Sequence, residues 1–339
     1  MMNSKWAISP PSWILVTGAN GYIGSHIVDQ LLTLGLRVRG TVRNDKPWLD
    51  HFFQSKYGPG KFESVVVPRL DDDDVLLRIL DGISGVIHVA SDLSFRPDAH
   101  EVIPPMVTAM RMLLRASSRT SVERFVLTSS SSAALLPNPG VEGIKVTEET
   151  WNYGAVNAAW EIHTPVENKH WMVYAASKTE VERAAWKWMK EYSPSFVLNS
   201  VLPDTNIGPI LHQNIGGSTM KITANLLEGN ESAIKNVPPQ WFVDVQDNAK
   251  MHVIALLSPE LESERLFAFS SPFNWTQVTN ILRNLRPHAP VPRVPEGEQE
   301  DLMDIIPAKR AEELLMSFYG HGWTNLETSL KRGIESLNK

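Results

Sequence analysis

The 339-residue sequence contains no cysteine, which excludes disulfides, thiolate catalysis and zinc–thiolate sites. No apolar run is long enough to span a bilayer, and the residues before position 13 lack the apolar stretch of a signal peptide. The net charge of −6 offers no surplus of positive charge for nucleic acid or an anionic membrane. The acidic run Asp71–Asp74 is most simply a solvated turn with a helix cap, so we expect no metal. We therefore expect a cytoplasmic protein without nucleic-acid or membrane partners.

Short apolar runs alternate with amphipathic helices as far as residue 203, which predicts a parallel sheet covered by helices. The expected strands are residues 13–18, 36–43, 62–67, 85–91, 124–131 and 196–203. After residue 203 the pattern loosens and turn residues become frequent, before a helical stripe returns at the C-terminus. We expect an α/β protein with a doubly wound parallel sheet and a smaller, mostly helical C-terminal lobe.

A glycine loop separates the first expected strand from the helix that follows it. Gly18, Gly21 and Gly24 have the spacing G-x-x-G-x-x-G. Glycines here let backbone N–H groups approach a pyrophosphate at the positive end of the helix. A tight turn without a ligand is the alternative, but the strand–turn–helix context makes the motif specific. The loop predicts a Rossmann-type dinucleotide-binding domain over residues 1–203, with a return segment near 236–257, and leaves residues 204–339 mainly to substrate binding.

The second expected strand indicates which dinucleotide is bound. A cofactor with a free ribose 2′-hydroxyl calls for an acidic residue at the end of this strand. Residues 36–43 contain no acid, and the first acid, Asp45, lies beyond them. The strand carries Arg37, Arg39 and Arg43 on one face, and a guanidinium suits a 2′-phosphate. Arginines that only face solvent are the alternative. The missing acid and the arginines together favour NADP(H).

Tyr174 and Lys178 share one face of an expected helix with Val181, Ala185 and Trp188. That face is otherwise apolar, so an ammonium group on it needs a partner or a function. Taken alone, the helix also fits a lysine whose apolar stem is buried while its ammonium group reaches solvent at the edge of the buried face. A free phenol titrates at about 10, and a cation one helical turn away can lower that value. Tyr174 and Lys178 are therefore a candidate pair for proton transfer.

The fifth expected strand ends in a serine cluster, TSSSS at residues 128–132, at the edge where open parallel sheets bind ligands. The glycine loop, HVAS at 88–91, this cluster and Tyr-x-x-x-Lys follow one another in the order typical of the extended short-chain dehydrogenase/reductases, which the sequence resembles. More narrowly it resembles dihydroflavonol reductases and fungal NADPH-dependent aldehyde and ketone reductases, through RGTVR, RFVLTSS, YAASKTEVE and the C-terminal GW-x-x-LE-x-SLK. This likeness covers nearly the whole chain.

The resemblance implies an NADPH-dependent carbonyl reductase that turns a small aldehyde or ketone into an alcohol with a Ser-Tyr-Lys triad. Tyr174 is implied to give its phenolic proton to the carbonyl oxygen while hydride from the nicotinamide reaches the carbon. Lys178 is implied to lower the pKa of Tyr174 and to hold the nicotinamide ribose. The family places the hydroxyl that orients the carbonyl on the third residue of the Thr-Ser-Ser cluster, which is Ser130. Ser129 is expected to point to the other side of the strand.

The predicted site residues come from the loops at the carboxyl edge of the sheet and from the Tyr174 helix. The predicted cofactor-binding residues are Gly18, Asn20, Gly21, Tyr22, Ile23, Gly24, Arg39, Arg43, Leu70, Val89, Ala90, Ser91, Tyr174, Lys178 and Pro203. The predicted substrate-binding residues are Phe95, Ser130, Val237, Gln240 and Trp241, with further contacts expected from residues 208–218. Phe95 and Trp241 are candidates for an apolar pocket wall, and plain core packing is the alternative.

One position departs from the family pattern. After the third strand, relatives usually carry an aspartate that binds the adenine amino group, and Arg69 occupies that place here. Either Asp71 or stacking by Arg69 could replace it.

Two other functions fit the same motifs. A nucleotide-sugar epimerase or dehydratase shares the fold, but usually shows the acid that is missing after the second strand. A non-catalytic NADP-sensing regulator would be expected to lose Tyr174 or Lys178, and both are present. The oligomeric state, monomer or homodimer, is left open.

Overall fold

The computed structural model describes residues 6–161, 165–294 and 296–337. A seven-stranded sheet lies at its centre, and every pair of neighbouring strands runs parallel. In spatial order these strands are β10 (Arg265–Ala268), β7 (Val197–Pro203), β5 (Arg124–Thr128), β4 (Ile83–His88), β1 (Trp13–Thr17), β2 (Arg37–Val42) and β3 (Phe62–Val66). The order reverses between β1 and β4, which is the switch point where such sheets bind ligands. The predicted doubly wound, Rossmann-type sheet is confirmed.

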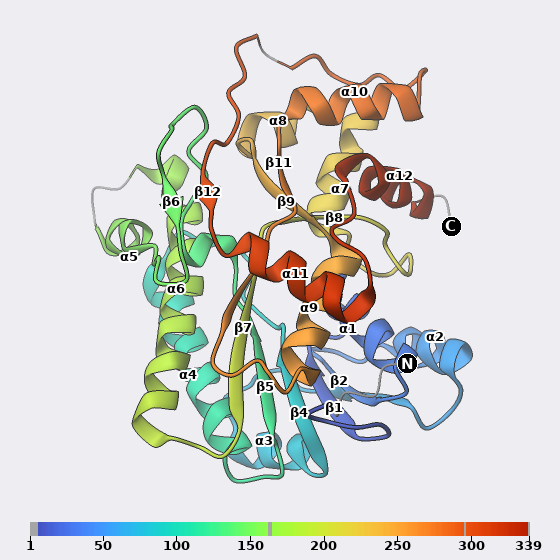
Figure 1. The fold of residues 1–339 in the computed structure, drawn as a ribbon, viewed down its shortest axis with the longest axis vertical. Coiled ribbons are helices and arrows are strands. Elements are labelled where there is room, and N and C mark those ends of the chain that lie inside the picture. The colour runs from blue at the N-terminus through green and yellow to red at the C-terminus, as the bar shows by residue number, and fades with distance from the viewer. Residues whose placement is uncertain (1–5, 162–164, 295, 338–339) are drawn as a thin grey trace.

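Helices cover both faces of the sheet (Figure 1). One layer packs through α1, α9 and α11, and the other through α3, α4 and α6. The helices of these layers are α1 (Tyr22–Thr33), α9 (Val245–Leu257), α11 (Ala308–Tyr319), α3 (Asp73–Leu80), α4 (Ala99–Ser117) and α6 (Val166–Tyr192), and α2 (Pro47–Tyr57) packs beside β3.

Side chains of β1 show why both layers form. Ile14 and Val16 join the core beneath α1 and α9, whereas Leu15 joins the core beneath α3, α4 and α6. Successive residues of a strand point to opposite faces, so a continuous apolar run is needed when both faces are covered. This is why the buried strands are recognisable in the sequence.

The strand β10 was not predicted, although the other six strands were. It is four residues long, pairs with β7 through partners such as Phe267 and Leu202, and forms one edge of the sheet. The helix α9, which lies within the expected return segment, contacts β4, β5, β7 and β10. The central sheet and its layers therefore draw on residues well beyond position 203.

The remaining elements gather beyond the carboxyl ends of the central strands, at the top of Figure 1. Two small sheets occur here: β8 (Thr205–Ile207), β9 (Gln240–Asp244) and β11 (Ser271–Phe273), and β6 (Lys145–Val146) with β12 (Asp304–Ile305). The helices and 3-10 turns are η1 (Ser131–Ala133), α5 (Tyr153–Trp160), α7 (Ser218–Ala224), η2 (Asn225–Glu228), α8 (Ser232–Asn236), α10 (Trp275–Leu285) and α12 (Leu326–Ser336). Among the described helices, none combines the length and the apolar character needed to cross a membrane.

Candidate active site

The glycine loop between β1 and α1 is shaped so that two of its positions accept no side chain. Gly18 has a φ of 68°, which favours glycine, and a Cβ there would lie 3.3 Å from the backbone of Ala90. A Cβ on Gly24 would lie 2.2 Å from the carbonyl oxygen of Gly18. Gly21 caps α1 without a side chain, so the N–H groups of the first helical turn are available to an anion. The loop therefore fits the pyrophosphate of a dinucleotide.

Thr17 holds the end of β4 against this loop. Its hydroxyl oxygen accepts hydrogen bonds of 3.0 Å from the N–H groups of Val89 and Ala90. The same hydroxyl lies 2.8 Å from Nδ1 of His88. Burial, helped by the charge of Lys178, lowers the pKa of His88 to about 3, so the imidazole is neutral at physiological pH. His88 is thus a packed, hydrogen-bonded residue of the strand end, and Val89 and Ala90 lie beside the glycine loop.

Of the two predicted arginines, Arg39 lies within β2 and Arg43 directly follows the last residue of that strand. Nη2 of Arg43 donates a hydrogen bond of 2.9 Å to the carbonyl oxygen of Ser91, at the carboxyl edge beside the glycine loop. Nε of Arg39 lies 2.6 Å from a carboxylate oxygen of Glu63, and its Nη1 donates to the carbonyl oxygen of Ile79 at 2.8 Å. Arg39 is therefore directed to the amino end of the sheet. Its prediction as a cofactor ligand is at odds with this position, whereas Arg43 is well placed.

Arg69 and Leu70 follow β3. The Arg69 side chain is 78% exposed and forms an ion pair with Asp71, whose pKa it holds below the usual value. Leu70 packs partly buried against the core beneath α3. Arg69 and Asp71 are therefore engaged with each other, and their roles toward adenine stay predictions.

Tyr174, Lys178 and Ser130 converge where β5 ends against α6. The ammonium group of Lys178 donates a hydrogen bond of 3.3 Å to the carbonyl oxygen of Thr128, and the Ser130 side chain lies close enough to Tyr174 to lower the pKa of its phenol. Burial lowers the pKa of Lys178 to about 8. Burial also raises the pKa of Tyr174, against the lowering effect of Ser130. The expected lowering of the Tyr174 pKa by Lys178 is not seen, and the phenol is neutral at physiological pH.

The neighbouring serines have different partners. Ser130 accepts hydrogen bonds from the N–H and the hydroxyl of Ser132, at 3.2 and 2.9 Å. Ser129 donates to the carboxylate of Glu182 at 2.7 Å, deeper along α6. Ser130 is thus the serine that the structure places beside Tyr174. Ser129, Ala90, Ser91 and Lys178 also line one small cavity of about 10 Å³, room for about one water molecule.

The sequence model of the NAD dependent epimerase/dehydratase family matches residues 14–267, which is more than half of the chain. The chain belongs to this family. The match covers the glycine loop, the serine cluster, Tyr174, Lys178 and all but the last residue of β10. The predicted relationship to the extended short-chain dehydrogenase/reductases is thereby confirmed.

The chain is similar to reductases over nearly its whole length. Ketoreductase adrE of Penicillium rubens is 44% identical over 333 residues, which are 96% of this chain and 97% of that protein. Aldehyde reductase 2 of Sporidiobolus salmonicolor is 39% identical over 325 residues, which are 94% of each chain. The structure of the yeast methylglyoxal/isovaleraldehyde reductase Gre2 complexed with NADPH is similar with a TM-score of 0.78 at 25% identity, covering 96% of this chain and 98% of Gre2. The predicted enzyme class, an oxidoreductase with a nicotinamide dinucleotide cofactor, is confirmed.

The predicted substrate residues of this family member fall into two groups. Phe95 has a φ of 51°, and its ring centroid lies 5.0 Å from that of Tyr174. Trp241 packs against the apolar cluster that contains Ala133, directly after the serines. Val237 instead accepts a hydrogen bond from the Trp275 indole and packs in the cluster beneath α10. The structure thus brings Phe95 to the Tyr174 ring and Trp241 to the serine turn, but not Val237.

Gln240 and Pro203 lie in different sheets. Gln240 is the first residue of β9, and its side chain donates to the carbonyl oxygen of Pro238 just before that strand. Pro203 is the last residue of β7 and pairs with Ala268 of β10. Asp204, which follows Pro203, was not predicted as a site residue.

Asp204 is a half-buried carboxyl group close to the catalytic candidates. It accepts a hydrogen bond of 2.7 Å from the N–H of Thr205 and a longer one of 3.4 Å from the Thr205 hydroxyl. Burial, together with the charge of Asp301, raises the pKa of Asp204 to about 7, and its charge also raises the pKa of Tyr174. No local pattern marks this aspartate, because Asp301 lies far away in the sequence.

The first turn of α1 is tied to the segment that follows β8. The Tyr22 hydroxyl donates a hydrogen bond of 2.8 Å to the carbonyl oxygen of Gly208, and Nε2 of His26 lies 2.8 Å from the carbonyl oxygen of Pro209. Tyr22 is buried there, and Ile23 packs against the same apolar cluster. The helix that follows the predicted cofactor loop therefore also holds the start of the predicted substrate segment at 208–218 in place.

Proposed function

We propose that this chain is an NADPH-dependent carbonyl reductase that converts a small aldehyde or ketone into an alcohol. The observation that carries the proposal is the convergence of Ser130, Tyr174 and Lys178 at the carboxyl end of β5. The glycine loop reaches the same edge of the sheet, since Gly18 approaches Ala90, and Ala90 and Lys178 line one cavity. The relatives named as a ketoreductase and an aldehyde reductase support this reaction class.

The chain's own residues fit NADPH. The glycine loop and the first turn of α1 would hold the pyrophosphate, and the segment Val89–Ser91 would lie along the nicotinamide half. Arg43 at the carboxyl edge would bind the 2′-phosphate, which no acid of β2 opposes. The NADPH bound by yeast Gre2 supports this choice.

Bound NADPH supplies hydride to the carbonyl carbon. The neutral phenol of Tyr174 gives its proton to the carbonyl oxygen as negative charge develops there. The hydroxyl of Ser130 donates a hydrogen bond to the same oxygen and so orients and polarises the carbonyl. The buried ammonium of Lys178 stabilises the tyrosinate that the proton transfer leaves behind, since an opposite charge in a low-dielectric site interacts strongly.

Replacement of Tyr174 by phenylalanine tests this assignment. Tyr174→Phe removes the proton donor and keeps the ring, so NADPH oxidation with a β-keto ester or an activated aromatic ketone should fall by about 10²- to 10⁴-fold. NADPH affinity, followed by fluorescence titration, should stay within about twofold of the wild type, because phenylalanine keeps the ring and the other predicted cofactor-binding residues are unchanged. Wild-type turnover in this variant would refute the mechanism. Tight NADPH binding without oxidation of any carbonyl by the wild type would favour the regulator instead.

The proposal also states which part of the chain binds the substrate. We assign residues 204–339 mainly to substrate binding, with three exceptions: β10 belongs to the central sheet, and α9 and α11 cover one of its faces. The cytoplasmic location and the oligomeric state, monomer or homodimer, stay predictions.

A further inference from the structure

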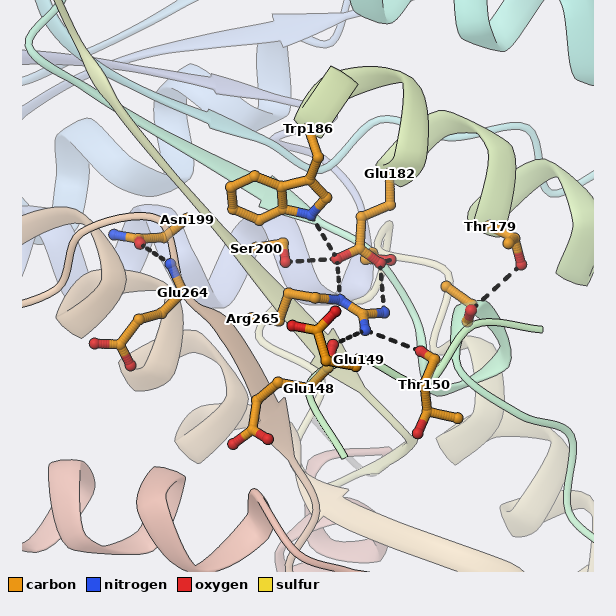
Figure 2. A network of polar contacts seen from close by, with 12 residues as sticks. Glu148, Glu149, Thr150, Thr179, Glu182, Trp186, Asn199, Ser200, Glu264 and Arg265 are labelled. Atoms are coloured by element: carbon orange, nitrogen blue, oxygen red, sulfur yellow. Dashed lines mark hydrogen bonds and ion pairs between the residues drawn. The ribbon is translucent and has the colours of Figure 1, made fainter. Parts of the chain in front are cut away.

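A carboxylate with no exposed surface lies on α6, one helical turn after Lys178. Glu182 is 0% exposed and has four hydrogen-bond donors around it (Figure 2). Ser129 of the β5 end and Ser200 of β7 each donate to it at 2.7 Å. Nε1 of Trp186 donates at 3.3 Å from the next turn of the helix. A buried carboxylate with this many donors is held in one place and orientation.

The counter-charge is Arg265, the first residue of β10. Its Nε lies 2.9 Å from one carboxylate oxygen of Glu182, and its Nη2 lies 3.3 Å from the other. Nη1 donates to the carbonyl oxygens of Thr150 and Glu148 (Figure 2). The guanidinium also lies 3.7 Å from the ring centroid of Trp151. This pair spans α6 and the edge of the sheet, and its guanidinium is fixed on several sides.

Three consecutive residues at the end of β5 contact α6 at positions four residues apart. The first, Thr128, accepts from Lys178, and the second, Ser129, donates to Glu182. The third, Ser130, lies close enough to Tyr174 to lower its pKa. The Glu182 contact therefore sets the register between the strand end and the helix that hold the catalytic candidates. A shift of either element would separate Tyr174 and Lys178 from their partners.

Glu182 also acts on the charge of Lys178. Burial lowers the pKa of Lys178 to about 8, and the negative charge of Glu182 opposes this effect. The other titratable groups that face Lys178 are His88 of β4 and His252 of α9, and burial keeps both neutral by lowering their pKa values to about 3 and 4. Tyr174 is neutral as well. The charge that helps to keep Lys178 protonated is therefore the carboxylate of Glu182.

We propose that Glu182 is a positioning residue for catalysis, which keeps Lys178 charged and keeps the end of β5 in register with α6. This inference rests on the proposed function, because it assumes that Tyr174 and Lys178 perform the reaction. A purely structural role is a poor explanation of the buried Glu182–Arg265 pair, since well-packed apolar residues usually stabilise such a place as well or better.

The test measures kcat/KM for NADPH-dependent ketone reduction against pH in the wild type and in Glu182→Gln. Loss of the carboxylate charge lets burial act on Lys178 unopposed, so the alkaline limb of the profile should move to lower pH by about one unit. Glu182→Asp keeps the charge, so its midpoint should match the wild type even where kcat is reduced. An unmoved midpoint in Glu182→Gln, or an equal shift in Glu182→Asp, would overturn the inference.

Asn199→Ala is the matched structural control. Asn199 is buried on β7 next to Ser200 and donates to the carbonyl oxygens of Ala255 and Leu261, away from α6. This variant should lose thermal stability while its midpoint stays in place. A midpoint that moves with Asn199→Ala as far as with Glu182→Gln would show that lost stability alone explains the shift, and would overturn the inference.

Two further variants keep the test decisive. Glu182→Gln leaves Arg265 without its partner, so the double variant Glu182→Gln with Arg265→Gln provides the same measurement in a fold without the unpaired charge. It should show the same shift, and an unmoved midpoint in it would equally overturn the inference.

Tyr174→Phe separates the two proposals. Turnover in Tyr174→Phe refutes the proposed function, whereas an inactive Tyr174→Phe with an unmoved Glu182→Gln midpoint refutes only the role of Glu182.

Discussion

The ammonium group of Lys178 lies 3.3 Å from the carbonyl oxygen of Thr128, and the lysine as a whole is 8% exposed. A lysine charge so far from water lowers the stability of the folded chain unless its surroundings compensate fully. The low pKa of Lys178, about 8, shows that they do not. The candidate active site therefore contains a charge that weakens the fold in return for activity, a trade-off found in many enzymes.

Lys178→Met should stabilise the protein while it abolishes turnover. The pKa of Lys178 is lowered on folding, so the stability penalty is present below about pH 8 and disappears as pH rises toward 10.5. Near pH 7 the variant should gain about 2 kcal/mol in free energy of unfolding, because the pKa shift outweighs the lost hydrogen bond to Thr128. Urea unfolding near pH 7 and near pH 10 measures this, and a gain of equal size at both would contradict it.

Asp204→Asn should change how the free energy of unfolding depends on pH between about pH 4 and about pH 7, below the range in which Lys178 titrates. The folded pKa of Asp204 is about 7, well above 3.8, so the folded state binds this proton more tightly than the unfolded state. The wild type therefore loses stability as pH rises from about 4 through about 7. Asparagine removes this slope, so the variant should gain relative to the wild type across that window in urea unfolding. Asp98→Asn, an exposed helix cap that asparagine also forms, should track the wild type.

Gly24→Ala should damage the cofactor loop. Its Cβ would lie 2.2 Å from the carbonyl oxygen of Gly18, so the loop must move, and we expect NADPH affinity to fall by at least about tenfold. Isothermal titration calorimetry with NADPH and a thermal unfolding curve measure the two effects. Gly154→Ala is the control, because the nearest atom to its Cβ is 3.8 Å away, on Asn152. An equal loss of NADPH affinity in both variants would show that the close approach at Gly24 is not what cofactor binding requires.

Arg43→Gln should weaken the preference for NADPH over NADH. Loss of a charge-assisted contact to the 2′-phosphate predicts a rise of about 10- to 100-fold in KM for NADPH, with little change for NADH. Arg39→Gln is the matched control, four residues earlier and within β2. Because Arg39 is bound to Glu63, its loss should reduce stability slightly and leave the cofactor preference unchanged. If Arg39→Gln changed the preference for NADPH over NADH and Arg43→Gln did not, Arg39 would be the residue that binds the 2′-phosphate.

The sequence predicted the parts of this fold whose signals are local. Buried parallel strands require unbroken apolar runs, and the glycine loop requires Gly18 and Gly24 for steric reasons. The helix with Tyr174 and Lys178 was likewise visible from its spacing. The strand β10 was missed because four residues at a sheet edge leave almost no pattern.

The residues that were misplaced or missed depend on partners far away in the sequence. Arg39 and Arg43 share one face of β2, and only Glu63 and Ser91 show which arginine reaches the carboxyl edge. Asp204 acquires its raised pKa from burial and from Asp301. Glu182 did leave a signal, since it follows Lys178 by one turn on the inward face of the helix. That signal has meaning only once Arg265 is known to lie opposite.

The hydrogen bonds from Tyr22 and His26 to Gly208 and Pro209 have a consequence for redesign of this enzyme. Because the cofactor helix anchors the start of the 208–218 segment, that start cannot be varied without disturbing dinucleotide binding. A library that seeks new carbonyl substrates should therefore leave these two anchor positions alone and concentrate its diversity further along the segment, where changes in pocket shape and in cofactor affinity can be separated.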